Sequence, residues 1–308
     1  MKYNRYQLFA FCLALLFSSG VLLPMAGRAQ GYAEGVGLSY ELLPLQPTND
    51  GGYNFRAAIF RANIIAPVVV AQDSTQSLLA GISLEALRFS GTRPGFDVST
   101  VYGISPILGY RYRISPKLEL MVLVLPALNS DLREVRGNDL TWGGVLRGTY
   151  RASPRLAYRA TVGYRQQFYG PQYVLLLGID WQAGPRWRVF GDLPTTFTVS
   201  HAMAPRVNVG FNLNGINTAY RLREQDRYFQ YQQGHYGLFV EGYVNTHWVL
   251  RATAAYAVTR RLDVFEKSDQ WPVTIDFIGF GAAPTPLNPR IDKGLAFRLA
   301  LSYRVAAQ

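Results

Sequence analysis

The chain has 308 residues, 49% of them hydrophobic and 14% aromatic, with a formal net charge of +11 at pH 7. Its single cysteine, Cys12, excludes a disulfide framework. The lysines and arginines are dispersed between apolar residues and form no runs, which excludes a nucleic-acid-binding arm.

Residues 1–29 have the pattern of a secretory signal peptide. Lys2 and Arg5 precede an apolar stretch at 8–23, and small residues after it predict cleavage after Ala29. The open alternative is a retained membrane anchor. Cleavage removes Cys12, three of the 31 basic residues and none of the 20 acidic ones, which lowers the net charge from +11 to +8. The exported chain, residues 30–308, is then one domain without cysteine, which excludes thiol catalysis.

From residue 33 onward, hydrophobic residues recur at every second position. In 102–114, mostly large apolar residues alternate with glycine, serine and arginine, and 155–165 and 294–305 repeat this split. A soluble β-sandwich also alternates, but its strands average about 5–6 residues and its outer face is polar. Longer strands with an apolar outer face fit a bilayer, where only a closed barrel pairs every backbone amide.

Fourteen segments of this kind follow one another: 33–43, 53–70, 77–89, 101–114, 117–128, 140–152, 155–168, 172–182, 186–193, 195–201, 206–221, 234–244, 247–262 and 293–304. They predict an all-β, closed antiparallel transmembrane β-barrel with both termini in the periplasm. Twelve strands are the alternative, because the pair around "GDLPTT" is short and four prolines fit poorly inside paired strands: Pro67, Pro106, Pro126 and Pro194.

A turn motif of a small residue, proline and lysine or arginine recurs at 115–117, 153–155, 184–186 and 204–206, and Asn245-Thr246 is a proline-free equivalent. Proline presets the backbone of a tight turn. Outer-membrane barrels have short periplasmic turns and longer external loops, so the motifs are assigned to the periplasm. Ordinary turn chemistry in any β protein is the open alternative. The longer connections, 129–139, 222–233 and 263–292, are then external.

Tyrosine and tryptophan occur at the ends of the predicted apolar face. An aromatic ring with a polar atom fits the boundary between lipid and water. The residues expected there are Trp142, Tyr150, Tyr158, Tyr164, Tyr173, Trp181, Trp248 and Tyr256.

Three stretches carry a family resemblance: "YRISPKLELMVLVLPALNSD", "VFGDLP" and the terminal "LALSYRV". With them the chain resembles the outer-membrane β-barrel proteins of Gram-negative bacteria grouped as domain of unknown function family 6268. The resemblance covers most of the exported chain and implies a location in the outer membrane but no activity. Lipid, lipopolysaccharide and the barrel-assembly machinery are the expected partners, and nucleic acid is not.

The sequence offers little for catalysis or cofactors. The histidines, His201, His235 and His247, are scattered and show no metal-ligand spacing. Ser200 adjoins His201, but adjacent strand residues point to opposite faces. His247 has no recognisable serine partner. We therefore expect no enzyme, no cofactor and no metal site.

The predicted inner face is rich in arginine. The residues expected to line the lumen are Arg111, Arg113, Arg147, Arg151, Arg155, Arg159, Arg206, Arg298 and Arg304, with the acids Glu85, Glu119, Asp180 and Glu241. Two interpretations stay open. The arginines either form ion pairs that fill a narrow barrel or form an anion-favouring constriction. The first suits a sealed structural or surface-binding barrel, and the second a passive channel or transporter for small solutes, anions included. We take the channel as the main hypothesis.

Overall fold

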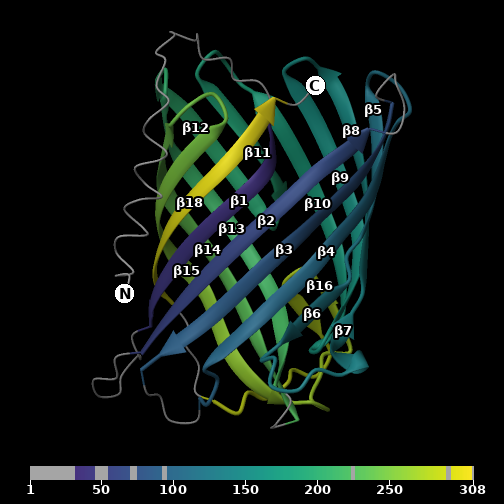
Figure 1. Ribbon diagram of the computed structural model, residues 1–308, viewed down its shortest axis with the longest axis vertical. Helices are drawn as coiled ribbons and strands as arrows, with labels where there is room; N and C mark the ends of the chain where they lie inside the picture. Colours follow the sequence, from purple (N-terminus) through teal and green to yellow (C-terminus); the bar gives the residue numbers. More distant parts are fainter. Residues whose placement is uncertain are drawn as a thin grey trace, which may run out of the picture.

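The computed structural model describes residues 32–45, 55–69, 75–91, 96–222, 226–288 and 293–306. The predicted signal peptide, residues 1–29, lies outside these ranges. Figure 1 shows one barrel of strongly tilted strands. The described residues contain one short 3-10 helix, Gly137–Asp139, and no helix that could span a membrane.

The wall has fourteen strands, two of them interrupted. They are β1 (Tyr32–Leu45), β2 (Phe55–Val69), β3 (Gln76–Ser90), β4 (Thr100–Arg113), β5 and β6 (Leu118–Val124 and Ala127–Ser130), β7 and β8 (Leu140–Thr141 and Gly143–Ser153), β9 (Leu156–Gln167), β10 (Gly170–Gln182), β11 (Trp187–Leu193), β12 (Thr196–Ala204), β13 (Val207–Leu222), β14 (Arg227–Tyr243), β15 (Trp248–Glu266) and β18 (Gly294–Ala306). Neighbours in this series pair antiparallel, and β18 closes the barrel on β1. The predicted closed antiparallel barrel of fourteen strands is confirmed, and the alternative of twelve is wrong.

The short motifs at 115–117, 153–155, 184–186 and 204–206 all lie at one end of the barrel, together with residues 32 and 306. We call this the turn end, which is uppermost in Figure 1, and the opposite end the loop end. The side chain of Ser115 shows how such a turn is fixed, because its Oγ accepts hydrogen bonds from the amides of Lys117 and Leu118, at 3.3 and 3.1 Å.

Two prolines face each other at an interruption of the wall. β4 pairs with β6 from Tyr102 to Ile104 and with β5 from Leu108 to Arg113, which leaves Pro106 without a partner on this side. Pro126 lies in the break between β5 and β6. A proline lacks the N–H that a paired position uses, so both fit where the ladder is already open.

The loop end differs from the sequence prediction. The expected loop 222–233 is mostly strand, because β14 begins at Arg227, and β15 continues to Glu266 inside the expected loop 263–292. Residues 228–233 are all buried, so both faces of this strand end are covered and no alternation marks it in the sequence. The rest of the loop after β15 carries a hairpin of β16 (Val273–Ile275) and β17 (Ile278–Phe280).

This hairpin fills part of a gap in the wall. β11 and β12 are short, so β10 pairs with β11 only from Leu177 onward. Beyond that point β16 pairs with β10 through Thr274 and Ile275. On the other side of the gap, the side-chain amide of Gln232 in β14 donates to the carbonyl of Phe277, at 3.1 Å. The exposed side chains of β16 and β17 are apolar and continue the apolar outer face.

The outer face is apolar at its middle and aromatic toward its ends. Seven of the eight aromatic residues expected there are exposed, and Trp248 is half-buried against Tyr303, with ring centroids 5.3 Å apart. Leu177 and Leu238 are each 70% exposed. Apolar side chains this exposed are stable in contact with acyl chains and costly in water.

The inside of the loop end is filled by an apolar core. We define this loop-end core by its buried members, which are Leu43, Phe55, Ala57, Ile59, Leu87, Phe89, Phe96, Val98, Val101, Tyr220, Leu222, Phe229, Tyr231, Ala255, Leu262, Val264 and Ala296. They come from β1–β4, β13–β15, β18 and the segment before β4. Arg221 of β13 also pairs in parallel with Ser130 of β6, and the amide of Asp131 donates to the Arg221 carbonyl at 3.0 Å. The wall therefore folds inward and closes around this core.

A second, smaller cluster attaches the segment after β15 to the wall. It contains Tyr169, Ala219, Tyr228 and Phe265, with Trp271 packed against it. The amide of Trp271 donates to the carbonyl of Tyr169 at 2.8 Å. Burial raises the pKa of the Tyr169 phenol well above its ordinary value, so this side chain stays neutral.

Gly170, next to this cluster, gives a test of how the segment is held. Its φ is 114°, and a β-carbon placed there would collide with the carbonyl oxygen of Trp271. We expect Gly170→Ala to cost about 1–3 kcal/mol locally and to speed amide hydrogen exchange in 267–288. Mobility on heat-modified gels, which reports the closed barrel, should not change. Gly184→Ala is the matched control, since a β-carbon at Gly184 would meet nothing within 4 Å beyond its chain neighbours. Equal exchange in both variants would contradict this attachment.

Candidate lumen site

The lumen contains three groups of charged side chains. The first lies near the middle of the barrel, where Arg61 of β2 pairs with Glu41 of β1 at 3.1 Å and with Glu85 of β3. The hydroxyl of Tyr220 donates to Glu85, and the side-chain amide of Gln233 donates to Glu41 at 3.0 Å. One guanidinium thus meets two carboxylates directly below the loop-end core.

The second group lies on the opposite side of the lumen. Arg147 of β8 and Arg159 of β9 share one carboxylate, that of Asp192 in β11, at 3.4 and 2.8 Å. Arg159 also donates to the carbonyls of Ile179 and Gly191. Arg188 of β11 pairs with Asp180 of β10 at 2.8 Å. We call the part of the lumen lined by Arg147, Arg159 and Arg188 the arginine lobe.

The third group lies at the turn end and is the most buried. Glu241 of β14 accepts from Arg251 of β15 at 2.9 and 2.5 Å and from Arg304 of β18 at 2.7 and 2.8 Å. Asn208 of β13 donates to the same carboxylate at 3.2 Å. The Glu241 side chain is 3% exposed and that of Arg304 is 6% exposed. Two guanidiniums again share a single carboxylate.

Other lumen arginines have weaker partners. Arg111 donates to the Ser77 hydroxyl at 2.9 Å, and Arg298 donates to the Ser39 hydroxyl at 3.2 Å. Arg151 is 3.9 Å from Glu119 and its side chain is 45% exposed. Within the described residues, no ion pair joins a carboxylate to Arg113, Arg155 or Arg206, and the latter two are exposed in turns.

The arrangement leaves positive charge in excess. Two arginines share one acid at Asp192 and at Glu241, and Arg111 and Arg298 bond to neutral hydroxyls. Arg61 has two acids, Arg188 has Asp180 to itself, and Glu34 is a further acid near Arg298 and Arg304. Guanidiniums keep their charge at any physiological pH. The arginine lobe and the turn end therefore offer a cationic surface to any solute in the lumen.

Sequence alternation had not indicated several of these residues. Asp192 follows Arg188 and Phe190 on one face of β11, so period two is consistent with an inward side chain. That Arg147 and Arg159 both bind this carboxylate cannot be read from the alternation. Glu41 and Arg61 lie among apolar inward residues of β1 and β2, and this mixed face hides them.

The histidines do not converge. His235 is buried and its Nδ1 lies 3.0 Å from the Gln233 amide nitrogen. His201 packs on Trp187 and His247 stacks on Tyr303, with ring centroids 4.4 and 5.2 Å apart. In the described part of the chain, no three His, Cys, Asp or Glu side chains are grouped as a metal ion would require.

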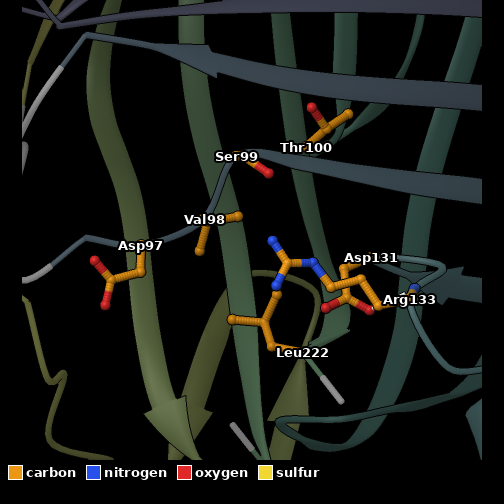
Figure 2. A pocket seen from close by; sticks show the side chains of 7 residues that line it. All are labelled: Asp97, Val98, Ser99, Thr100, Asp131, Arg133 and Leu222. Atoms are coloured by element: carbon orange, nitrogen blue, oxygen red, sulfur yellow. Dashed lines mark hydrogen bonds between the residues drawn. The ribbon is translucent and has the colours of Figure 1, made fainter. Parts of the chain in front are cut away.

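A small cavity lies at the loop end between the segment before β4 and the segment after β6. It measures about 20 Å³ and is lined by Asp97, Val98, Ser99, Thr100, Asp131, Arg133 and Leu222. Figure 2 shows the Arg133 guanidinium reaching across it toward Val98 and Leu222. This volume holds about one water molecule and no larger solute.

Comparison with known proteins gives a family and several similar structures. No curated protein matches the sequence. A TodX deltaS2S3 mutant, described as a monoaromatic hydrocarbon channel, is similar with a TM-score of 0.47 and 12% identity, over 96% of this chain and 94% of that one. An outer membrane channel from Pseudomonas putida F1 has a TM-score of 0.43 and 8% identity, over 92% and 100%. The NanC porin has a TM-score of 0.40 and 6% identity, over 88% and 100%.

The sequence itself matches one family over residues 90–270, from the segment before β4 into the loop after β15. This range covers more than half of the chain and includes all four proline-containing turns. The chain belongs to the family described as "Domain of unknown function (DUF6268)".

Proposed function

We propose that the protein is an outer-membrane channel for small solutes that prefers anions, with its turn end in the periplasm. The observation that carries this proposal is the excess of arginine over acid in the arginine lobe and at the turn end. Fixed cations inside a passage with low-dielectric walls concentrate anions and repel cations. The exposed apolar outer face supports the membrane location.

In the conformation described, the loop-end core occupies the external end of the lumen on the side of β1–β4 and β13–β15. A passage on this side of the lumen therefore requires this core to rearrange. The loop-end core also favours a second candidate function, a sealed structural barrel, because an apolar core and buried ion pairs stabilise a barrel that never opens.

Planar-bilayer recording separates the two functions. We expect the wild type to conduct with anion preference. In Arg111→Gln/Arg151→Gln, the permeability ratio should move toward cations by about tenfold for each charge, because a unit charge about 6 Å away shifts the energies of an anion and a cation by about 0.7 kcal/mol each, in opposite directions, in a water-like medium. Arg136→Gln, at an exposed loop-end residue paired with Glu134, is the control and should change nothing. A folded, inserted wild type without any conductance would favour the sealed barrel.

A further inference from the structure

The recurrent turns at the turn end share one backbone hydrogen bond. In each, the residue after the proline accepts, through its carbonyl, from an amide of the next hairpin. The pairs are Lys117 with Arg151, Arg155 with Gln182, Arg186 with Ala202, and Arg206 with Tyr243, at 2.8, 2.8, 2.8 and 2.9 Å. His247 and Thr75 make the same bond, to Arg304 and Arg113, both at 2.8 Å. The four basic residues are therefore at structurally equivalent positions.

Each of the four residues directly precedes a strand, and continuing the alternation of that strand by one residue puts it on the lumen side of the wall. In a strand, residues two apart point to the same face. Lys117 is two residues before Glu119, Arg186 is two before Arg188 and Arg206 is two before Asn208, and these three later residues bond inside the lumen. Arg155 precedes Arg159 by four residues, which also places it on the same face as a residue that bonds inside the lumen. The four side chains therefore stand at the mouth of the lumen.

Turn chemistry does not require their charge. The serine and proline define the bend, as the Ser115 and Ser153 hydroxyls show by accepting from the amides of Lys117 and Arg155, at 3.3 and 3.2 Å. Asn245 makes a comparable bond to the amide of His247 without proline or a lysine. The four basic side chains are exposed, and among the described residues none of them forms an ion pair.

The four turns are consecutive around one half of the rim, from β4 to β13. Neighbouring turns are separated by two strands, about 10 Å. The same half of the wall carries Arg147, Arg159 and Arg188 deeper inside. The other half encloses the loop-end core. The charge is thus placed over the arginine lobe and not over the filled side.

We infer that Lys117, Arg155, Arg186 and Arg206 form a cationic collar that gathers small multivalent anions at the turn-end mouth and passes them to the arginine lobe. The passage step rests on the proposed channel function, but the binding step does not. Since the four charges are about 10 Å apart, they act through their summed field and favour solutes of charge −2 or more, such as phosphate esters, over monovalent anions. Salt should suppress the effect, because the Debye length falls from about 30 Å at 0.01 M to about 3 Å at 1 M.

The test uses the folded barrel in neutral detergent and inorganic pyrophosphate as the probe. The collar variant carries Lys117→Gln, Arg155→Gln, Arg186→Gln and Arg206→Gln. The matched control neutralises four exposed loop-end residues, with Arg56→Gln, Arg88→Gln, Arg133→Gln and Lys293→Gln. By isothermal titration at low salt, we expect the collar variant to bind pyrophosphate at least tenfold more weakly than wild type. The control should stay within twofold of wild type.

The outcomes distinguish the collar from the channel. If the collar variant, with normal heat-modified gel mobility, binds pyrophosphate as wild type does, the collar is wrong, whatever the conductance. If wild type binds the probe and the collar variant does not, but neither conducts in bilayers, the collar stands and the channel function fails. If wild type binds the probe through the collar and also conducts, its current at low salt should rectify, because only one mouth of the channel carries the charge. The collar variant should lose this rectification.

Discussion

Replacing Glu241 with glutamine should destabilise the barrel by about 3–5 kcal/mol, because it removes the buried carboxylate that Arg251 and Arg304 share. Glu241 bonds to Arg251 of β15 and to Arg304 of β18, two strands that pair with each other in the wall. Its side chain and that of Arg304 are almost fully buried. The guanidinium of Arg304 cannot regain its water without opening the wall, whereas the Arg251 side chain is 22% exposed.

The measurement is urea unfolding of the refolded protein in lipid vesicles, followed by tryptophan fluorescence. Glu134→Gln is the matched control, since its pair with Arg136 is about half exposed on both sides and such pairs contribute about 0–1 kcal/mol. If Glu241→Gln and Glu134→Gln unfold at the same urea concentration, the carboxylate of Glu241 does not stabilise the barrel through its ion pairs. A double variant, Glu241→Gln with Arg304→Gln, should recover part of the loss.

Replacing Phe96 with alanine should open the loop end and raise conductance. Phe96 precedes β4 and makes no strand pairing, and its ring lies 5.2, 4.9 and 5.9 Å from those of Phe55, Phe89 and Phe229. Phe96, like Val98, is a core residue outside the strands, so truncating its side chain leaves the strand pairing of the wall in place. Loss of a buried phenylalanine costs about 3–5 kcal/mol and leaves a cavity among the remaining rings.

Single-channel recording and unfolding together check this result. We expect more frequent or larger openings in Phe96→Ala than in wild type, at lower overall stability. Phe297→Ala removes the same side chain from the exposed outer face and should leave the openings unchanged. Unaltered conductance in a destabilised Phe96→Ala variant would mean that the core does not close the passage.

The strands were largely predictable because a barrel wall in lipid imposes alternation on every residue of a spanning segment. The short turns were predictable because proline and serine act locally. Where side chains are buried on both faces, as in 228–233, the period-two signal is absent, and alternation does not reveal the beginning of β14. The pairing of Arg221 with Ser130, and the hairpin of β16 and β17, depend on contacts between distant parts of the chain that no local pattern encodes.

The lumen site was predictable in composition and not in pairing. Alternation predicts that Arg147 and Arg159 face inward, but their meeting at Asp192 depends on strand register and on the curvature of the wall. Sharing of one acid by two arginines is therefore a property of the assembled barrel. The separation of the loop-end core from the arginine lobe is likewise a property of the assembled barrel.

The closure of β1 on β18 has a consequence for how the protein is made. Tyr32 pairs with Ala306, so the first strand, which pairs with β2 on one side, finds its second partner only when the last strand has been synthesised. Until then two edges of unpaired amides and carbonyls, each flanked by apolar side chains, are open to pairing with other chains. The unclosed sheet must remain shielded until its last strand pairs, and truncation of the last strand alone would leave an aggregation-prone open sheet rather than a smaller barrel.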